Sequence, residues 1–176
     1  MSSAPLQTDQ ADEYLYETAS GLDSDILDAV SDYRADSFLE INAWLRHGAH
    51  RSGIEDTVTL IDLGFHYQDP LEHSLAVYRG VRNKFAGQLV GSSPGESFED
   101  LAFMSTSLER QVAEDFAGQF GAVLCLIVPP CHRVLYLPAL FHDTVNREEF
   151  EVLLDRGQEF EVISVSDQTV SARLVQ

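Results

Sequence analysis

The chain has little of what defines several common protein classes. Only two of its 176 residues are cysteines, Cys125 and Cys131, and they do not form a CxxC pair. Two cysteines are too few for a fold that disulfides hold together. No apolar run approaches the roughly 20 residues of a membrane-spanning helix, and the N-terminal MSSAPLQTDQADEYLYE lacks the basic and apolar segments of a signal peptide. We therefore expect neither a membrane span nor a signal peptide.

Positive charge is also scarce. Lysine and arginine together number 11 against 29 aspartates and glutamates, so the formal net charge is -18, and Lys84 is the only lysine. A protein that binds nucleic-acid phosphates over a broad surface needs the opposite balance of charge. Any contact with DNA or RNA would therefore have to be local.

Motifs of several enzyme classes are absent as well. The chain contains neither of the phosphate-binding glycine patterns GxGxxG and GxxxxGK[ST]. His47 and His50 lie three residues apart, but no third ligand follows at a usable spacing. We therefore expect no metal site and no phosphate-binding glycine loop.

What is present suits one globular domain. A chain of this length with 44% hydrophobic residues can bury a single core. Residues 1 to about 20 are polar and acidic without a clear period, so we expect a mobile leader there. One domain over residues 21–176, monomeric, is expected to follow.

The first part of that domain has the 3.6-residue apolar period of three helices. The apolar stripes consist of Ile26, Leu27, Val30 and Tyr33, then Phe38, Ile41 and Leu45, then Ile54, Val58, Ile61 and Phe65. Capping boxes at Ser37/Glu40 and Ser52/Glu55 are predicted to begin the second and third helices, which end near Gly48 and Gly64.

From about residue 75 the apolar period changes to two, which is typical of strands. The segments with this pattern are LAVYRGV, LAFMSTS, GAVLCLIV, HRVLYL, EFEVLL, QEFEVISV and TVSARLV. LERQVAEDFAG has a helical period, GQLVGSSPGE is interpreted as a loop, and the Asp155-Arg156-Gly157 turn is predicted to join two strands as a hairpin. Helices followed by strands indicate an α+β fold.

Arg79 does not fit the pattern of its strand. Alternation places it on the same face as Leu75, Val77 and Val81, which is otherwise apolar. An arginine in that position needs an anion. Two alternatives are open: an ion pair with one of the many carboxylates, or a clamp on a phosphate or carboxylate ligand, with Gly80 letting the ligand approach the backbone.

Two further polar groups occupy strands. Ser105, Thr106 and Ser107 end an apolar strand, either as an ordinary strand end or as hydroxyls that orient a ligand such as a sugar. Glu149 and Glu151 lie two apart on a predicted strand, so their carboxylates would share one face and repel each other. Such a pair is either exposed to solvent or, if it is sheltered from water, stabilised by a shared proton or a bound cation. Glu159-Phe160-Glu161 repeats the pattern.

These features follow one another in a fixed order: an arginine after an aromatic residue, then Ser-Thr-Ser, then Glu-x-Glu. In this order they resemble the arginine-serine-glutamate class of mono-ADP-ribosyltransferases, which includes bacterial toxins and arginine-specific vertebrate enzymes. The flanks DYRADSFLEINAWLR, AVYRGV, FMSTSLERQVAEDFAG and EEFEVLLDRGQEFEVI are also similar to the family's. The resemblance implies that N-terminal helices precede a mostly antiparallel, mixed β-sandwich of two packed sheets.

The resemblance also implies roles for individual residues, with NAD as the substrate and no metal. Arg79 would bind an NAD phosphate, Ser105 would position the nicotinamide ribose and support Glu151, and Glu151 would hold the ribose 2′-hydroxyl. Glu149 would receive an acceptor arginine. Because VLLDRG follows Glu151, Glu149 and Glu151 match the family's pair. The residues expected to bind the cofactor are Tyr78, Arg79, Gly80, Ser105, Thr106, Ser107, Phe116 and Glu151.

Residues 138–147 occupy the position of the family's acceptor-recognition loop, the ARTT loop. Its one large aromatic residue, Phe141, either docks the target or anchors the loop on the core. The family often has an aromatic residue and an arginine after the Ser-Thr-Ser motif. Phe116 and Phe120 are candidates for the aromatic residue, but no arginine occurs between Arg110 and Arg133.

The implied activity is transfer of ADP-ribose from NAD to an arginine of a target protein, with release of nicotinamide. The alternatives are an NAD glycohydrolase, a transferase acting on nucleic acid, and a non-catalytic interaction module with the same fold. The acidic composition disfavours a nucleic-acid acceptor. The protein is expected to act in the cytoplasm of the cell that makes it, or of a target cell after delivery by a phage or a secretion system.

Overall fold

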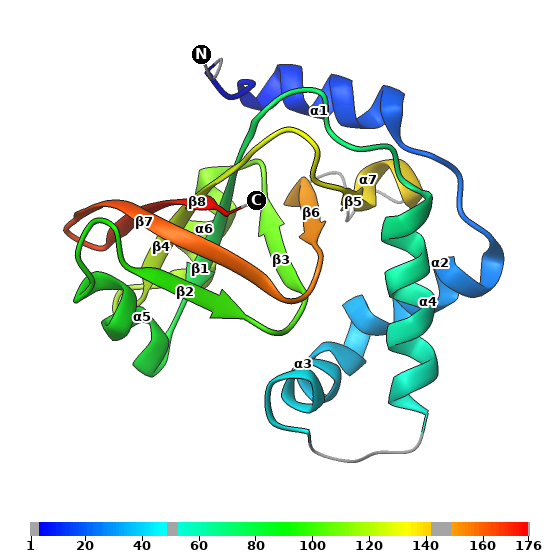
Figure 1. The fold of residues 1–176 in the computed structure, drawn as a ribbon, viewed down its shortest axis with the longest axis horizontal. Helices are drawn as coiled ribbons and strands as arrows, with labels where there is room; N and C mark the ends of the chain where they lie inside the picture. The colour runs from blue at the N-terminus through cyan, green and yellow to red at the C-terminus, as the bar shows by residue number, and fades with distance from the viewer. Residues whose placement is uncertain (1–3, 49–52, 142–148, 176) are drawn as a thin grey trace.

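A computed structural model describes residues 4–48, 53–141 and 149–175 (Figure 1). In this part of the chain, helical segments come first: α1 (Thr8–Thr18), α2 (Ser24–Asp32), the π-helical η1 (Tyr33–Ser37), α3 (Phe38–His47) and α4 (Ile54–Tyr67). The later helices are α5 (Asn83–Val90), α6 (Arg110–Ala117) and the short α7 (Leu137–Leu140). None of the described helices is long and apolar enough to cross a membrane.

The predicted helices are confirmed, but one of their predicted boundaries is wrong. α2, η1 and α3 follow one another without a break, because Ser37 keeps a right-handed helical backbone (φ -85°, ψ -11°) and forms no side-chain cap. A π-helical segment therefore stands where the Ser37/Glu40 capping box was predicted. α3 ends as predicted at Gly48, whose φ is 68°. Ser52, of the other predicted capping box, lies outside the described residues.

The strands are β1 (Leu75–Val81), β2 (Ser97–Asp100), β3 (Met104–Ser107), β4 (Ala122–Val128), β5 (Val134–Tyr136), β6 (Glu151–Leu154), β7 (Gln158–Ser166) and β8 (Thr169–Leu174). They form one hydrogen-bonded sheet in the order β2-β7-β8-β4-β1-β3-β6-β5. Neighbouring strands are antiparallel, apart from the parallel pair β4–β8. The mostly antiparallel, mixed arrangement agrees with the α+β prediction.

The expected packing of two sheets is not confirmed, and two other expectations about the strands differ from the structure. Hydrogen bonds join the described strands into one continuous sheet, and its strong twist sets β2 and β7 across the direction of β3 and β6 (Figure 1). β6 and β7 do not pair, so residues 155–157 form a corner and not a hairpin. GQLV belongs to α5 and not to a loop, and SFED forms the additional strand β2.

Apolar side chains are buried on both faces of the sheet. On one side, α2 and α4 pack against β5, β6 and Phe103, which directly precedes β3, through residues such as Val30, Ile61 and Leu153. On the other side, a larger cluster contains Leu75, Val77 and Leu124 together with Val152 and Leu154. Alternate residues of β6 therefore face different clusters, as the period of two requires.

Residues 8–18, expected to belong to a mobile leader, instead form α1, which runs along one end of the molecule in Figure 1. Ala11 and Leu15 are buried in the larger core cluster. The Thr8 hydroxyl donates to the Leu108 carbonyl at 3.2 Å, and the Glu72 backbone N–H donates to the Tyr14 hydroxyl at 2.8 Å. The sequence analysis did not predict this helix, because the segment is mostly polar and has only two buried apolar residues. Such a short apolar stripe is still enough to hold a helix against a sheet.

Candidate active site

The three adjacent strands β1, β3 and β6 bring Arg79, Ser105 and Glu151 together. The Arg79 Nη1 donates to the Ser105 carbonyl at 3.2 Å. The Ser105 Oγ donates to the Glu151 Oε1 at 2.5 Å. Residues that are 72 positions apart in the sequence thus form one chain of hydrogen bonds across three strands, with a guanidinium at one end and a carboxylate at the other.

Glu151 is a buried acid, with 7% of its surface exposed. Burial raises the pKa of its carboxyl above the ordinary value of 4.5, because the charged form loses hydration. The hydrogen bond from Ser105 acts in the opposite direction and lowers this pKa, whereas the negative charge of Glu149 raises it. Ser105, together with the positive charge of Arg34, therefore favours the ionised form of Glu151.

Arg79 is half-buried, and burial lowers the pKa of its guanidinium. Of the two alternatives for this residue, an ion pair with a carboxylate is not formed within the described part of the chain. Its one hydrogen bond there goes to a neutral carbonyl, and a guanidinium has five N–H donors. This arrangement suits an anionic group supplied from outside the protein.

Glu149 does not lie on the strand, contrary to the prediction for Glu149 and Glu151. β6 begins at Glu151, and Phe150 before it has a left-handed backbone with φ 46°. The chain therefore turns between the two glutamates, which leaves Glu149 exposed while Glu151 is buried. The Ser107 Oγ holds this turn, because it donates to the Glu149 carbonyl at 2.6 Å and accepts from the Glu109 N–H at 2.9 Å.

The three hydroxyls of the Ser-Thr-Ser motif have different partners. Only that of Ser105 donates to a described side-chain carboxylate. The Thr106 hydroxyl donates to the Val152 carbonyl at 2.6 Å, and Ser107 binds the backbone around Glu149. Thr106 and Ser107 thus hold β3 and the start of β6 together, and their expected contact with NAD stays a prediction.

The other face of β1 is covered by α6. A Cβ added to Gly80 would lie 2.3 Å from the Ala113 carbonyl oxygen and 2.7 Å from the Ala117 nitrogen. The space beside Gly80 is therefore filled by a helix, which corrects the expectation that its missing side chain admits a ligand. Tyr78 packs against the same helix through Ala113 and Ala117.

The structure shows the surroundings of Phe116 and Phe141, the two aromatic residues predicted to contact NAD and the target. Phe116, on α6, is 59% exposed, and the Arg82 guanidinium lies 4.5 Å from its ring centre. Phe141 packs against the helical core cluster, and the Arg34 guanidinium lies 5.6 Å from its ring centre. Phe141 thus anchors the start of the predicted acceptor loop on the core, and residues 142–148 of that loop lie outside the described residues.

The sequence analysis missed a polar network that joins η1, α3 and the end of β2. The Arg46 guanidinium binds the Asp100 carboxylate through two hydrogen bonds of 2.9 and 2.8 Å. The Tyr33 hydroxyl lies 3.0 Å from Asn42 Nδ2, which donates to it, and burial raises the pKa of Tyr33 to about 12. Asn42 and Arg46 lie four residues apart on α3, and this polar pair beside an apolar stripe was the available signal.

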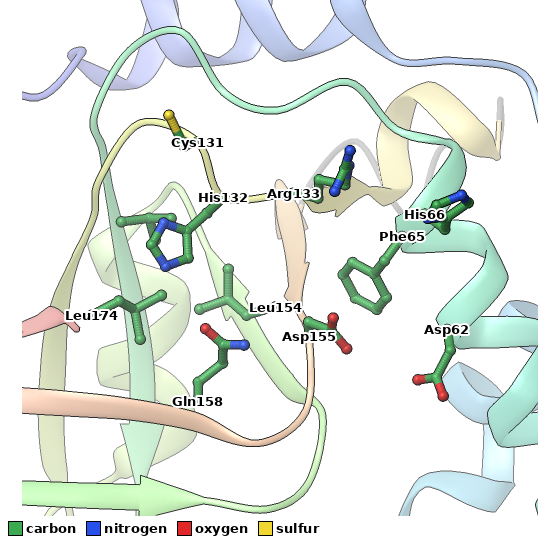
Figure 2. Close-up of a pocket in the computed structure, with 11 residues that line it drawn as sticks. Asp62, Phe65, His66, Cys131, His132, Arg133, Leu154, Asp155, Gln158 and Leu174 are labelled. Atoms are coloured by element: carbon green, nitrogen blue, oxygen red, sulfur yellow. The ribbon is translucent and has the colours of Figure 1, made fainter. Parts of the chain in front are cut away.

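Figure 2 shows a separate cavity of about 330 Å³ between α4 and the ends of β4, β6 and β8. Arg79, Ser105 and Glu151 do not line it. Its lining residues are Asp62, Phe65, His66, Val128, Cys131, His132, Arg133, Leu154, Asp155, Gln158 and Leu174. Among the described residues, no group of three or more His, Cys, Asp or Glu side chains could hold a metal ion, here or elsewhere. His50, of the weak His47/His50 pair, is outside the described residues.

Comparison with known proteins places this arrangement in a family. The family model described as ADP-ribosyltransferase exoenzyme matches residues 10–176. NAD(+)--arginine ADP-ribosyltransferase EFV of Enterococcus faecalis is 27% identical over 81% of this chain and 29% of its own length. Exoenzyme T of Pseudomonas aeruginosa is 28% identical over 95% of this chain and 35% of its own length. The chain thus spans about a third of the length of these relatives.

Among solved structures, the Clostridium limosum C3 exoenzyme has the same fold. The two chains superpose with a TM-score of 0.77 at 17% sequence identity, and the match covers 100% of this chain and 98% of that one.

Proposed function

Because the chain belongs to the ADP-ribosyltransferase exoenzyme family, we propose that it transfers ADP-ribose from NAD to an arginine side chain of a target protein and releases nicotinamide. The observation that carries this proposal is the hydrogen-bonded chain from Arg79 through Ser105 to the buried Glu151, with the exposed Glu149 two residues away. This hydrogen-bonded chain joins Arg79, which has no carboxylate partner in the described structure, to the buried carboxylate of Glu151.

Arg79 suits the phosphates of NAD. A guanidinium donates two parallel hydrogen bonds to a phosphate, and such charge-assisted bonds are about twice as strong as neutral ones. Arg79 donates to the backbone carbonyl of Ser105, the residue whose hydroxyl binds Glu151. We therefore assign Arg79 to binding the pyrophosphate, which leaves the adjacent nicotinamide ribose beside Glu151.

Glu151 suits the reacting sugar. In NAD the bond between ribose C1′ and the nicotinamide nitrogen breaks with both electrons going to nicotinamide, which leaves as a neutral molecule. Positive charge then develops on the ribose, as in glycoside hydrolysis. An ionised carboxylate at the ribose stabilises that charge, and the hydrogen bond from Ser105 favours the ionised form and orients it.

Glu149 suits the acceptor. Its side chain is exposed, and a guanidinium is the cation that matches a carboxylate best. The arginine nitrogen forms a bond to C1′ and loses one proton, which we assign the Glu149 carboxylate to accept. The Enterococcus faecalis relative, named an NAD(+)--arginine ADP-ribosyltransferase, supports the choice of arginine.

Two measurements on the purified protein test the proposal: release of nicotinamide from NAD, and transfer of labelled ADP-ribose to agmatine, a small guanidine compound. Glu151→Gln is expected to reduce both activities by about 10²- to 10⁴-fold, because it removes the charge that stabilises the transition state. Glu149→Gln is expected to abolish or sharply reduce transfer while release largely continues, since water still captures the ribose.

The control variants are Glu159→Gln and Glu161→Gln on β7. Glu159 is exposed, and Glu161 pairs with Arg173 at the surface at 3.2 Å. Both are expected to keep full activity. Parallel loss of both activities in the Glu149 and Glu151 variants would contradict the separate roles. Nicotinamide release without any transfer by the wild-type protein would indicate an NAD glycohydrolase, and the absence of both activities would indicate a non-catalytic module.

A further inference from the structure

A second cavity, of about 470 Å³, lies between α1, the segment from β5 to α7, and the turn before β6. Figure 1 shows α1 running past this part of the sheet, and α1 contacts α7. The cavity, called the α1 hollow below, is lined on the α1 side by Asp12, Glu13, Tyr16 and Glu17, and on the other by Tyr136, Pro138 and Phe150. Its volume lies within the roughly 300–1,000 Å³ of ligand-binding pockets.

The lining of the α1 hollow has the chemistry of a cation site. Three of its residues carry a carboxylate, three carry an aromatic ring, and none is basic. The hydroxyl of Tyr136, which is 2% exposed, donates to the Asp12 Oδ1 and so fixes that carboxylate against a buried ring. Glu13 and Glu17 are exposed, and neither forms an ion pair within the described part of the chain. Carboxylates beside aromatic faces suit a lysine or an arginine side chain.

The α1 hollow is tied to the turn that carries the two glutamates of the candidate active site. Phe150, in its wall, is the residue between Glu149 and Glu151. The Leu108 N–H donates to the Phe150 carbonyl at 3.1 Å, and the Leu108 carbonyl accepts from the Thr8 hydroxyl of α1 at 3.2 Å. Leu108 therefore holds α1 and this turn in a fixed relation.

A protein that presents an arginine to Glu149 covers more than that one residue. A standard protein–protein interface buries roughly 800 Å² and about 20–30 residues on each side. Because Phe150 directly follows Glu149, the α1 hollow falls within such an interface. The net charge of -18 makes a basic surface on the partner the complementary one.

We propose that the α1 hollow is an exosite for the target protein, which binds a second basic side chain, a lysine or an arginine, near the arginine that accepts ADP-ribose. The inference rests on the proposed transfer to arginine, and it adds a determinant of which arginine is modified. Glu13 and Glu17 supply the negative charge. The aromatic rings pack along the aliphatic part of the basic side chain and against its charged end.

The test measures transfer of labelled ADP-ribose to three acceptors: agmatine, a peptide with one arginine flanked on both sides by lysines, and the same peptide with glutamines in place of the lysines. The double variant Glu13→Gln/Glu17→Gln is expected to raise the KM for the lysine-flanked peptide by about 10-fold. Its KM for agmatine and for the glutamine-flanked peptide should stay within about 2-fold of wild type, because these acceptors bring no second cation to the hollow.

Charge reversal provides a second measurement that a structural role of the glutamates would not affect. Glu13→Lys/Glu17→Lys is expected to lower the KM for a glutamate-flanked arginine peptide below the wild-type value and to raise the KM for the lysine-flanked one. The matched control is Glu96→Gln/Glu99→Gln, which removes the same charge at exposed positions next to and within β2, at the opposite edge of the sheet from β5. It should leave all of these KM values unchanged.

The outcomes separate this inference from the proposed function. Equal changes with all acceptors in the Glu13→Gln/Glu17→Gln variant, or a rise for the lysine-flanked peptide that Glu96→Gln/Glu99→Gln reproduces, would overturn the exosite while transfer to arginine stands. Wild-type protein that modifies the lysine-flanked and glutamine-flanked peptides with the same KM would overturn it as well. Absence of transfer to every acceptor would overturn the proposed function and the exosite together.

Discussion

At the scale of single residues, the buried carboxyl of Glu151 links its proposed role in catalysis to the stability of the fold. Its pKa is raised in the folded protein, first by burial and then by the charge of Glu149. Between the ordinary value of 4.5 and the raised value, the folded state binds more protons than the unfolded state. The free energy of unfolding therefore contains a contribution that is fully present below pH 4.5 and is lost as the pH rises through the raised pKa.

Glu151→Gln is expected to remove this dependence, because an amide does not ionise. Near neutral pH the variant should be more stable than the wild-type protein, and the difference should disappear at acidic pH, where the wild-type carboxyl is protonated. Thermal melts at a series of pH values measure this. Glu161→Gln, at a surface ion pair, is the control and should follow the wild-type profile. A constant difference between Glu151→Gln and wild type at all pH values would show that the ionisation of Glu151 is not responsible.

Ser105→Ala tests the hydrogen bond that opposes the effect of burial on the pKa of Glu151. The Ser105 hydroxyl lowers the pKa of Glu151, so its loss should move the acid limb of the pH profile for nicotinamide release to higher pH. The rate at neutral pH should fall roughly 10- to 100-fold, which corresponds to a hydrogen bond to a charged group. Thr106→Ser, which keeps a hydroxyl for the Val152 carbonyl, is the control. An unchanged pH profile with a reduced rate would assign Ser105 to ribose binding alone.

At the scale of elements, the contact between β1 and α6 depends on the absence of a side chain at Gly80. An added Cβ would lie 2.3 Å from one backbone atom of α6 and 2.7 Å from another, and backbone atoms cannot rotate away. α6 covers the strand that carries Arg79. The position of Arg79 therefore depends on a glycine that does not itself contact a ligand.

Gly80→Ala is expected to destabilise the protein by about 1 to 3 kcal/mol, as overpacking does in a filled interior. This corresponds to a fall in Tm of roughly 2–4 °C per kcal/mol for a chain of this size. Gly87→Ala is the matched control, because a Cβ there meets nothing within 4 Å on the exposed side of α5. It should stabilise the protein by about 0.5–1 kcal/mol. Equal Tm values for the two variants would mean that α6 adjusts without cost.

At the scale of the whole molecule, different helices of the N-terminal region cover the two faces of the sheet. α2 and α4 cover one face at β5, β6 and Phe103, and α1 contributes Ala11 and Leu15 to the cluster on the other face. Since burial of apolar surface is the main favourable contribution to folding, α1 is part of the domain and not an appendage.

Leu15→Ala tests the place of α1 in the core. Leu15 is 3% exposed, so the substitution should lower the free energy of unfolding by about 2–5 kcal/mol, measured by urea denaturation. Leu39→Ala, on α3, is the control, because Leu39 is 68% exposed and should change stability by less than about 0.5 kcal/mol. Equal, small effects would indicate that α1 detaches in solution without loss of the core.

The sequence by itself determined which residues face inward and in what order the reactive groups occur. Leu75, Val77 and Val81 share a buried face with the half-buried Arg79, and α4 buries Ile54, Val58, Ile61 and Phe65 as their spacing predicted. These features follow from periods of 2 and 3.6 residues, which depend only on local backbone geometry. The same local signals singled out Arg79 and Ser105, because polar residues at strand positions stand out against an apolar pattern. The choice of Glu149 and Glu151 over Glu159 and Glu161 came from the resemblance to the family.

Only the tertiary structure decided how these parts meet. Periodicity assigns a strand to a face but does not choose its neighbour, so the pairing of β6 with β3 and β5, and of β7 with β2 and β8, was not predictable from the Asp155-Arg156-Gly157 turn. The left-handed Phe150, which exposes Glu149, is held by the Ser107 hydroxyl and by the pairing of β6 with β3. The Arg46–Asp100 pair joins residues 54 positions apart. Such contacts depend on how segments that are distant in the sequence pack together, and a local sequence pattern does not predict that packing.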